Sequence, residues 1–365
     1  MQGKYKNWLQ YGLARTRRAL LRAAIRPLVT WEPVSEPRDG YTIVVGCNTP
    51  LAEMLAANLH MLGRQRLANL DRIVVVFDEP KSQMPFAAEE AMRRAYPELP
   101  LEFAYYTRRQ ARVCRMIGFA WVNCWLSWCI GIAAARSRYC LLHDFDAMLI
   151  DPEIVESRYE EIRRREAQYC RVRNYIGNGI EATDGLVVTF EMMFDLEFLR
   201  RTFHPIDLYN SIGRLDGRTV DFDTFLYPQR KAGISFVLGV PEQDMVHPSQ
   251  VICQFSGLMN SRDYVPPETN NLLMIPYFLF LAGKPESMTS TRRELELAKL
   301  QFGRSIQFFG RRMNLSRLSD SHARWLEKQA FRLEQATAGR VRQDVSDYFG
   351  AIKAVAGIGA RSQNA

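Results

Sequence analysis

The sequence predicts an α/β fold with a mainly parallel β-sheet flanked by helices. Between residues 41 and 143, short β-branched segments alternate with segments of helical spacing, a pattern typical of parallel sheets covered on both faces. The chain has 365 residues, 47% of them hydrophobic and 24% charged, which suffices for a sizeable core. In such sheets ligands bind beyond the carboxyl ends of the strands. Polar residues that directly follow strands are therefore the first candidates for a functional site.

The elements of this alternation can be assigned in chain order. The strands are expected at Tyr41–Cys47, Arg72–Phe77, Leu101–Tyr106 and Tyr139–His143. The helices are expected at Leu51–Leu62, Glu89–Ala95 and Met116–Ala135. The last of these carries no charge and is long enough to span a bilayer, but it lies between two strands that we expect in one sheet. We therefore predict that it is buried against that sheet.

The N-terminal segment, residues 1–38, is basic. Residues 1–31 hold seven Lys or Arg residues and no Asp or Glu, out of 48 basic and 40 acidic residues in the chain. Subtracting the seven leaves 41 basic against 40 acidic residues elsewhere. The rest of the protein is therefore nearly neutral, which argues against nucleic acid as a partner.

The same segment has the spacing of an amphipathic helix. One side carries most of its larger apolar residues, namely Leu9, Leu13, Leu20, Leu21, Ala24 and Leu28. Two interpretations stay open. The helix lies on an anionic membrane surface, or it packs on the folded domain with its basic face in solvent.

The α/β region is expected to span residues 39–287, with a further apolar strand at 186–190, directly after Asp184. A helical extension is expected at 288–355 and a disordered tail at 356–365. In the extension, Phe302, Ile306 and Phe309 suggest an apolar stripe along a helix. Such a stripe is expected to pack on the parent domain.

The cysteines indicate the cellular compartment. All seven are scattered and none forms a CxxC pair, which is typical of a protein in a reducing compartment. No uncharged apolar core follows the early positive charges, so a secretory signal is not expected. We expect a cytoplasmic protein, peripheral at the inner face of the membrane if its N-terminal helix binds lipid.

The segment LLHDFDAML carries the most chemistry. In an extended chain residues i and i+2 point the same way, so Asp144 and Asp146 present two carboxylates to one side, just past a buried strand. Two such carboxylates repel each other unless a cation binds between them. Oxygen ligands favour Mg²⁺ or Mn²⁺, which commonly bridge carboxylates to the phosphates of a substrate.

This segment resembles the donor site of family 2 glycosyltransferases of the GT-A fold, in the run IGIAAARSRYCLLHDFDAM. Three further segments follow the family's order: VVGCNTPLAEMLAANL, with Asn48 after its strand; VVVFDEP, with Asp78 after its strand; and VDFDTFLYPQRKAGISFVLGVP, an acidic segment. The resemblance extends from Tyr41 to Gln254, a little over half of the chain. It implies a Rossmann-like GT-A domain.

The resemblance also implies an activity: metal-dependent transfer of a sugar, with inversion, from a UDP- or GDP-sugar to a hydroxyl of a saccharide or lipid-linked acceptor. The setting it suggests is the synthesis of cell-surface polysaccharide or glycolipid. The ligands of Mn²⁺ or Mg²⁺ are expected to be Asp144, Asp146 and His247. Contacts to the nucleotide sugar are expected from Cys47, Asn48, Asp78, Arg115 and Asp144.

The general base is expected to be Asp221, with Asp223 as the second candidate. For several of these residues a purely structural role stays open. Asp221 or Asp223 could cap the helix that follows them, His247 could hold the turn before Pro248, and Arg115 could be a solvated helix end.

Two other functions stay open as well. A DxD motif also occurs in haloacid-dehalogenase-like phosphatases, although there it follows the first strand of the domain. The family's Arg-Asn pair, before the glycine of the helix, is replaced here by Trp128 and Cys129, which leaves open a GT-A-like scaffold that works by binding alone. A sugar nucleotidyltransferase is disfavoured, because no Gly-rich basic loop follows Tyr41–Cys47.

Overall fold

The computed structural model describes residues 5–84, 88–186, 188–231, 235–237, 244–301 and 303–362. The chain forms two compact units. Unit 1 comprises Met1–Pro50, Gly63–Phe145 and Asp151–Pro241, and unit 2 comprises Leu51–Leu62, Asp146–Ile150 and Glu242–Ala365. Each unit is described by itself below.

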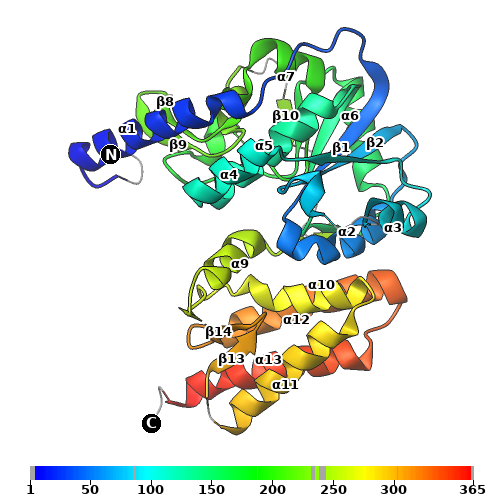
Figure 1. Ribbon diagram of the computed structural model, residues 1–365, viewed down its shortest axis with the longest axis vertical. Helices are drawn as coiled ribbons and strands as arrows, with labels where there is room; N and C mark the ends of the chain where they lie inside the picture. The colour runs from blue at the N-terminus through cyan, green and yellow to red at the C-terminus, as the bar shows by residue number, and fades with distance from the viewer. Residues whose placement is uncertain are drawn as a thin grey trace. The chain divides into compact units, whose positions relative to one another are not determined.

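Unit 1 is built on a seven-stranded sheet of order β10-β6-β7-β4-β1-β2-β3 (Figure 1). Its strands are β1 (Arg38–Cys47), β2 (Leu70–Phe77), β3 (Leu101–Tyr105), β4 (Ser137–Asp144), β6 (Tyr169–Arg171), β7 (Met192–Asp195) and β10 (Ser235–Val237). The pairs β4–β1, β1–β2 and β2–β3 are parallel, and β7 runs antiparallel to both β4 and β6. The predicted α/β class with a mostly parallel sheet is therefore confirmed.

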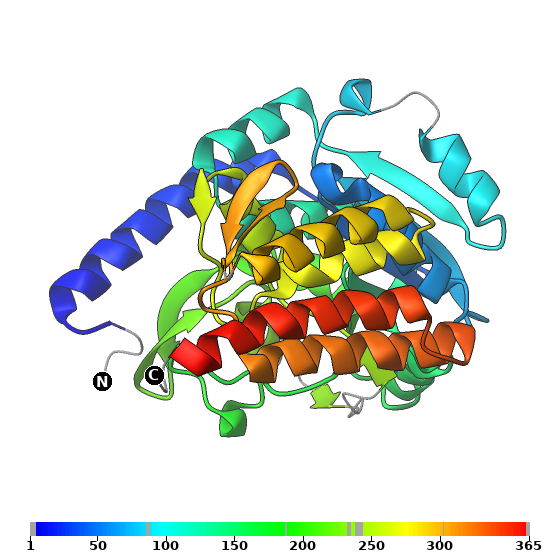
Figure 2. The same ribbon diagram turned by 90° about the horizontal axis from the view of Figure 1, so that it is seen from below.

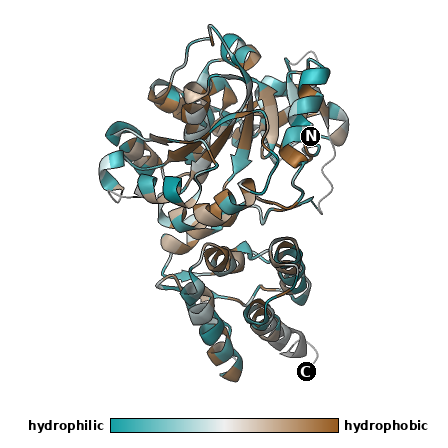
Figure 3. Ribbon diagram, turned by 90° about the vertical axis from the view of Figure 1, so that its right-hand side faces the viewer, coloured by the Kyte–Doolittle hydropathy of each residue, from teal (hydrophilic) through white to brown (hydrophobic). Residues whose placement is uncertain are grey.

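Helices flank this sheet, whose strands are rich in hydrophobic residues (Figure 3). They are α1 (Trp8–Ile25), α3 (Ala88–Ala95), α4 (Arg108–Ile117), α5 (Ala120–Ala134), α6 (Ile154–Arg164), α7 (Leu196–Thr202) and α8 (Leu226–Gln229). The predicted helix at 116–135 is two helices, because Gly118 ends α4 in the left-handed region at φ 68°. No described helix is both long and apolar enough to cross a membrane.

Helix α5 is buried against the sheet, as predicted. Trp125, Leu126 and Cys129 are fully buried in the core that α5 shares with the strands. Gly131 lies so close to β1 that a Cβ atom there would come within 2.2 Å of Val44 Cγ1. The absence of a side chain at this position therefore allows the close approach of helix and strand.

Helix α1 packs within unit 1 with its basic side inward, which differs from the interpretation that places its basic face in solvent. Arg18 pairs with Asp221 and Arg22 with Asp207, while Leu9, Leu13 and Leu20 are 72%, 64% and 67% exposed. Leu9, Leu13 and Leu20 thus face solvent, because the carboxylates of unit 1 attract the guanidinium groups, whereas Leu28 is buried and Leu21 packs against the core.

A hairpin of β8 (Ser211–Leu215) and β9 (Arg218–Phe222) completes the regular structure of unit 1. It has its own small core, formed by Ile180, Leu186, Leu215, Val220, Phe222 and Leu226. The strand predicted at 186–190 is wrong for the described residues of that segment, of which Leu186 instead packs in this core. The antiparallel strand of the main sheet is β7, a few residues later.

Unit 2 is mainly helical, and its long helices α11, α12 and α13 pack in a layer (Figure 2). Its helices are α2 (Leu55–Leu62), α9 (Val251–Met259), α10 (Ile275–Leu281), α11 (Pro285–Leu300), α12 (Asp320–Ala338) and α13 (Gln343–Ser362). Its strands are β5 (Met148–Leu149), β11 (Met245–Val246), β12 (Asp263–Tyr264), β13 (Ser305–Phe308) and β14 (Arg311–Asn314). Helix α13 continues to Ser362, into the segment predicted to be a disordered tail.

The helical stripe predicted near residue 306 is wrong. Ile306 lies on β13 and pairs with Met313 of β14, and Phe309 begins the turn between them at φ 48°. Phe302 lies outside the described residues. Alternating burial along β13 places Ile306 and Phe308 inward, so the apolar residues follow the period of a strand and not that of a helix.

Candidate functional site

The carboxyl ends of β1 and β2 bring two predicted site residues together. These strands are parallel neighbours, with Cys47 opposite Phe77. Asn48 Nδ2 donates to Asp78 Oδ2 at 2.9 Å, and the backbone N–H of Thr49 donates to Asp78 Oδ1 at 2.8 Å. The arrangement follows from the topology, since adjacent parallel strands end at the same edge of a sheet.

The pair is half-buried. Burial raises the pKa of Asp78, although hydrogen bonds from Thr49 and Asn48 act against the shift. Burial also raises the pKa of the Cys47 thiol, and the charge of Asp78 adds to the effect. Cys47 is therefore a neutral thiol at physiological pH, and a role for it is confined to packing or weak hydrogen bonding.

Asp144 lies at the same edge of the sheet. It is the last residue of β4, which pairs with β1 on the side opposite β2, so that Asp144 is level with Gly46. In the spatial order β4, β1, β2, the first strand ends in Asp144, and the other two are directly followed by Asn48 and Asp78.

Asp146 and His247 meet in unit 2. Strands β5 and β11 pair antiparallel, with Met148 opposite Val246. Asp146 precedes β5 and His247 follows β11, so the pairing brings the two side chains to one end of this short ladder. His247 Nε2 lies 3.5 Å from Asp146 Oδ1, and Asp146 is buried.

Only Phe145 separates Asp146 from Asp144 in the chain, which keeps both carboxylates near the imidazole. The ligand atoms of Asp144, Asp146 and His247 all lie within 4.8 Å of one another. Within the described part of the chain, this is the one group of at least three His, Cys, Asp or Glu side chains arranged in this way. Two carboxylates and one imidazole form a donor set that suits Mn²⁺ and also accepts Mg²⁺.

A buried charge network that the sequence did not reveal supports the end of β4. His143 Nδ1 contacts Glu191 Oε1, and Arg158 Nη1 lies 2.9 Å from Glu191 Oε2. All three side chains are fully buried. Because His143 directly precedes Asp144, the network fixes the strand just where the first carboxylate of the DxD motif begins.

This network predicts a stability effect that depends on pH. Burial alone would raise the pKa of Glu191, but His143 and Arg158 outweigh it and hold the pKa below its ordinary value of 4.5. A lowered folded-state pKa stabilises the protein above pH 4.5, and this contribution is lost as the pH falls through the folded-state pKa.

We expect Glu191→Gln to lower the free energy of unfolding at pH 7 by about 3 kcal/mol, because it leaves Arg158 buried without its counter-charge. The difference in the free energy of unfolding between variant and wild type should narrow below pH 4.5. Urea denaturation at several pH values measures both effects. Glu161→Gln is the matched control, because that residue pairs with Arg164 at the surface and its loss should change little. If this difference in the free energy of unfolding stays constant with pH, it contradicts the assignment of the ion pair between Arg158 and Glu191.

The two candidate bases lie on and beside the β8–β9 hairpin. Asp221 is on β9 and accepts hydrogen bonds from Tyr5 Oη at 3.1 Å and from Arg18 Nη1 at 3.3 Å. Asp223 accepts from Asn210 Nδ2 and from the Thr224 backbone N–H, both at 2.8 Å. The N-cap of α8 is Phe225, without a side-chain capping bond, so neither aspartate serves as that cap.

The remaining predicted contacts have local partners. Arg115, in the last turn of α4, forms an ion pair with Glu79 at 3.0 Å. Glu79 directly follows Asp78, so Arg115 lies near the end of β2. Asp184 pairs with Arg218. The parts of the acidic segment at 232–234 and 238–241 lie outside the described residues.

Comparison with known proteins yields structural similarity but no sequence match. No family model matches the chain, and no curated protein does. TarS 1–349 from S. aureus in complex with UDP-GlcNAc is 10% identical, with a TM-score of 0.36, covering 89% of this chain and 92% of that chain.

Two further similar structures are those of proteins named as transferases. The mannosyltransferase PcManGT from Pyrobaculum calidifontis, in complex with GDP-Man and Mn²⁺, is 15% identical, with a TM-score of 0.31 and 96% of both chains covered. The galactosyltransferase LgtC, in complex with donor and acceptor sugar analogues, is 12% identical, with a TM-score of 0.33, covering 44% of this chain and 60% of that chain. These TM-scores are low, so the functional argument rests on the residues of this chain.

Proposed function

We propose that this protein is a GT-A-type glycosyltransferase that moves a sugar from a nucleotide-diphosphate sugar to an acceptor hydroxyl and requires a divalent metal ion. The observation that carries the proposal is the group of Asp144, Asp146 and His247. Its first member ends β4, at the same edge of the sheet where Asn48 follows β1 and Asp78 follows β2. A cation site next to polar groups at this edge of a parallel sheet is suited to a nucleotide diphosphate.

In this proposal each residue has a defined role. Asp144, Asp146 and His247 hold Mn²⁺ or Mg²⁺, and a bound ion would neutralise charge that develops on the diphosphate. Asn48 and Asp78 orient the nucleoside of a UDP- or GDP-sugar, with Cys47 packing below them. Arg115 contributes positive charge near the end of β2.

The proton of the acceptor hydroxyl is taken by a carboxylate of the hairpin region, Asp221 in the first place and Asp223 in the second. We place the reaction in the inverting class, because a single displacement needs one such base. Saccharide or lipid-linked acceptors of cell-surface polysaccharide or glycolipid synthesis suit this chemistry.

The test is the melting temperature of the wild type with UDP, GDP, UDP-GlcNAc and GDP-mannose, each with Mn²⁺ or with EDTA. A ligand that binds only the folded state raises the melting temperature by mass action. We expect either the uridine or the guanosine nucleotides to raise the melting temperature with Mn²⁺ and not with EDTA. If no nucleotide shifts melting under either condition, the proposal fails and a binding scaffold becomes the better description.

We also propose that the outward face of α1 binds the surface of an anionic membrane, at the cytoplasmic side. Its exposed large residues are Trp8, Leu9, Leu13 and Leu20, and α1 contains no acidic residue. Arg17 lies over the ring of Phe119, 5.5 Å from its centroid, which joins this face to the exposed Met116 and Trp121. Apolar side chains flanked by basic groups are typical of interfacial helices.

For this surface we expect Leu13→Asp to reduce binding to phosphatidylglycerol vesicles about tenfold, because burying one leucine contributes about 1.5–3 kcal/mol. Co-sedimentation with vesicles measures the effect. The control is Leu300→Asp, a 75% exposed leucine on α11, which should bind like the wild type. Equal binding to phosphatidylcholine vesicles, or no binding by the wild type, would contradict the proposal.

A further inference from the structure

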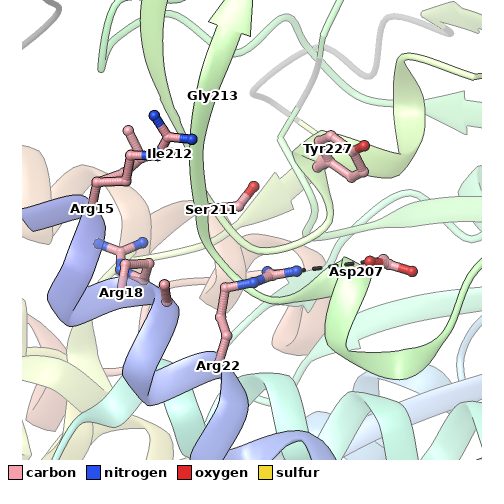
Figure 4. A pocket seen from close by; sticks show the side chains of 9 residues that line it. Arg15, Arg18, Arg22, Asp207, Ser211, Ile212, Gly213 and Tyr227 are labelled. Atoms are coloured by element: carbon pink, nitrogen blue, oxygen red, sulfur yellow. Dashed lines mark ion pairs between the residues drawn. The ribbon is translucent and has the colours of Figure 1, made fainter.

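A basic pocket lies in unit 1 between α1 and β8, and the mechanism proposed above does not use it (Figure 4). Its volume is about 360 Å³. The lining residues are Arg15, Arg18, Ala19, Arg22, Asp207, Ser211, Ile212, Gly213 and Tyr227. Three guanidinium groups and one carboxylate thus face a space that accommodates a sugar-sized molecule.

The arginines reach the pocket because of their spacing on α1. Arg15, Arg18 and Arg22 stand at positions i, i+3 and i+7, which share one face of a helix. Figure 4 shows them side by side along α1, on the side that faces the hairpin. The N-terminal helix therefore supplies most of the charge of this pocket.

The positive charge exceeds the negative charge that the described residues offer. Arg22 pairs with Asp207 at 3.7 Å and donates to the Tyr209 carbonyl at 2.7 Å. Arg18 pairs with Asp221 at 3.3 Å. Arg15 has no ion-pair or hydrogen-bond partner in the described part of the chain. Burial lowers the pKa of Arg22, and the charge of Asp207 acts against this shift.

Two further groups point to a ligand with both polar and apolar parts. Ser211 Oγ is buried, and no described residue supplies its hydrogen-bond partner. Tyr227 lies across the pocket from the arginines (Figure 4), and its ring provides an apolar surface with a polar tip. Inorganic phosphate would leave most of this space and the ring unused.

The pocket adjoins the first candidate base. Arg18 belongs to the pocket lining and also contacts Asp221. In the hairpin, Ile212 of the lining is directly opposite Asp221, and opposite residues of an antiparallel pair project to the same face. The proposed donor contacts, by contrast, follow β1 and β2.

We propose that this pocket binds an oxyanion, a phosphate or a carboxylate, that is carried by the acceptor saccharide. The inference rests on the proposed transferase function, and it names the acceptor class as anionic. Arg15, Arg18 and Arg22 bind the oxyanion through charge-assisted hydrogen bonds, Ser211 donates to it, and Tyr227 contacts the sugar ring. The acceptor is thereby held beside Asp221.

Calorimetric titration with glucose 6-phosphate, glucuronate, glucose and inorganic phosphate tests this, without donor or metal. We expect the two anionic sugars to bind at least about tenfold more tightly than glucose and than inorganic phosphate. Arg15→Gln should weaken them about tenfold, because it removes one charged donor. Arg17→Gln removes the same charge from the exposed side of α1 and should leave the affinity unchanged.

The inference is overturned if glucose or inorganic phosphate binds as tightly as the anionic sugars. It is also overturned if Arg15→Gln and Arg17→Gln weaken the binding of the anionic sugars equally. Arg15 is exposed, so its replacement should not unfold the protein. Metal-dependent stabilisation by a nucleotide is measured on the same Arg15→Gln sample and should persist. If anionic sugars fail to bind while a nucleotide still raises the melting temperature, only this inference is wrong. If the wild type shows neither sugar binding nor stabilisation by a nucleotide, the transferase proposal is wrong as well.

Discussion

Asp146→Asn is expected to abolish the metal-dependent stabilisation by nucleotides and to lower sugar transfer about 10³-fold, since a bound ion contributes several kcal/mol to the reaction. The substitution keeps the shape of the side chain and removes one of the two negative charges of the DxD motif. Asp146 is buried and faces His247, so no solvent-exposed carboxylate can take its place. Melting curves with Mn²⁺ and a radiolabelled-donor assay measure the two effects.

The control for this variant is Asp263→Asn, an exposed aspartate of unit 2 that pairs loosely with Arg312 at 3.8 Å. This variant should retain both the metal-dependent stabilisation by nucleotides and the rate of sugar transfer. His247→Ala tests the third ligand and should weaken the dependence on Mn²⁺, shifting the half-maximal metal concentration upward about tenfold. If Asp146→Asn keeps full Mn²⁺-dependent stabilisation, these residues are not the metal site, and the transferase proposal loses its main support.

Asp221→Asn is expected to lower kcat by about 10²–10⁴-fold while donor binding is retained, because a general base acts only on the transferred proton. Asp223→Asn should change kcat only slightly if Asp221 is the base. If Asp223 is the base, Asp223→Asn should cause the large loss of kcat and Asp221→Asn the small one. The acid limb of the pH profile of kcat should disappear in the variant that lacks the base. Kinetics at saturating donor measure all three quantities.

The matched control is Asp207→Asn, because Asp207 holds α1 through Arg22 in the same way that Asp221 holds it through Arg18. A large loss in Asp221→Asn with near-normal turnover in Asp207→Asn supports proton transfer. Equal losses in both would show that Asp207 and Asp221 act by docking α1, and would contradict the assignment of Asp221 as the base.

Local sequence was sufficient to predict the strands that build the site. β1, β2 and β4 were predicted within a few residues of their observed ends, because dense β-branched and apolar runs fit a sheet buried on both faces. The meeting of Asn48 with Asp78 followed from parallel neighbours ending at one edge. The burial of α5 followed from its lack of charge and its place between two strands.

Other features depend on long-range contacts that the spacing of residues does not encode. Leu9, Leu13 and Leu20 of α1 point outward because Asp207 and Asp221, about two hundred positions away in the chain, attract the arginines on its other face. Glu191 looks like an ordinary surface residue in the sequence, yet it is buried between His143 and Arg158. Its role could not be predicted from its neighbours in the chain.

The sequence by itself thus determined the α/β class, the positions of the central strands along the chain and the DxD motif after β4. The tertiary structure alone decided which side of α1 faces the protein, that residues 305–314 form a hairpin, and how Asp146 meets His247. That contact depends on the antiparallel register of β5 and β11, which are separated by almost a hundred residues. Local propensity sets the period of each element, but the pairing of distant elements is set by packing and charge in the folded chain.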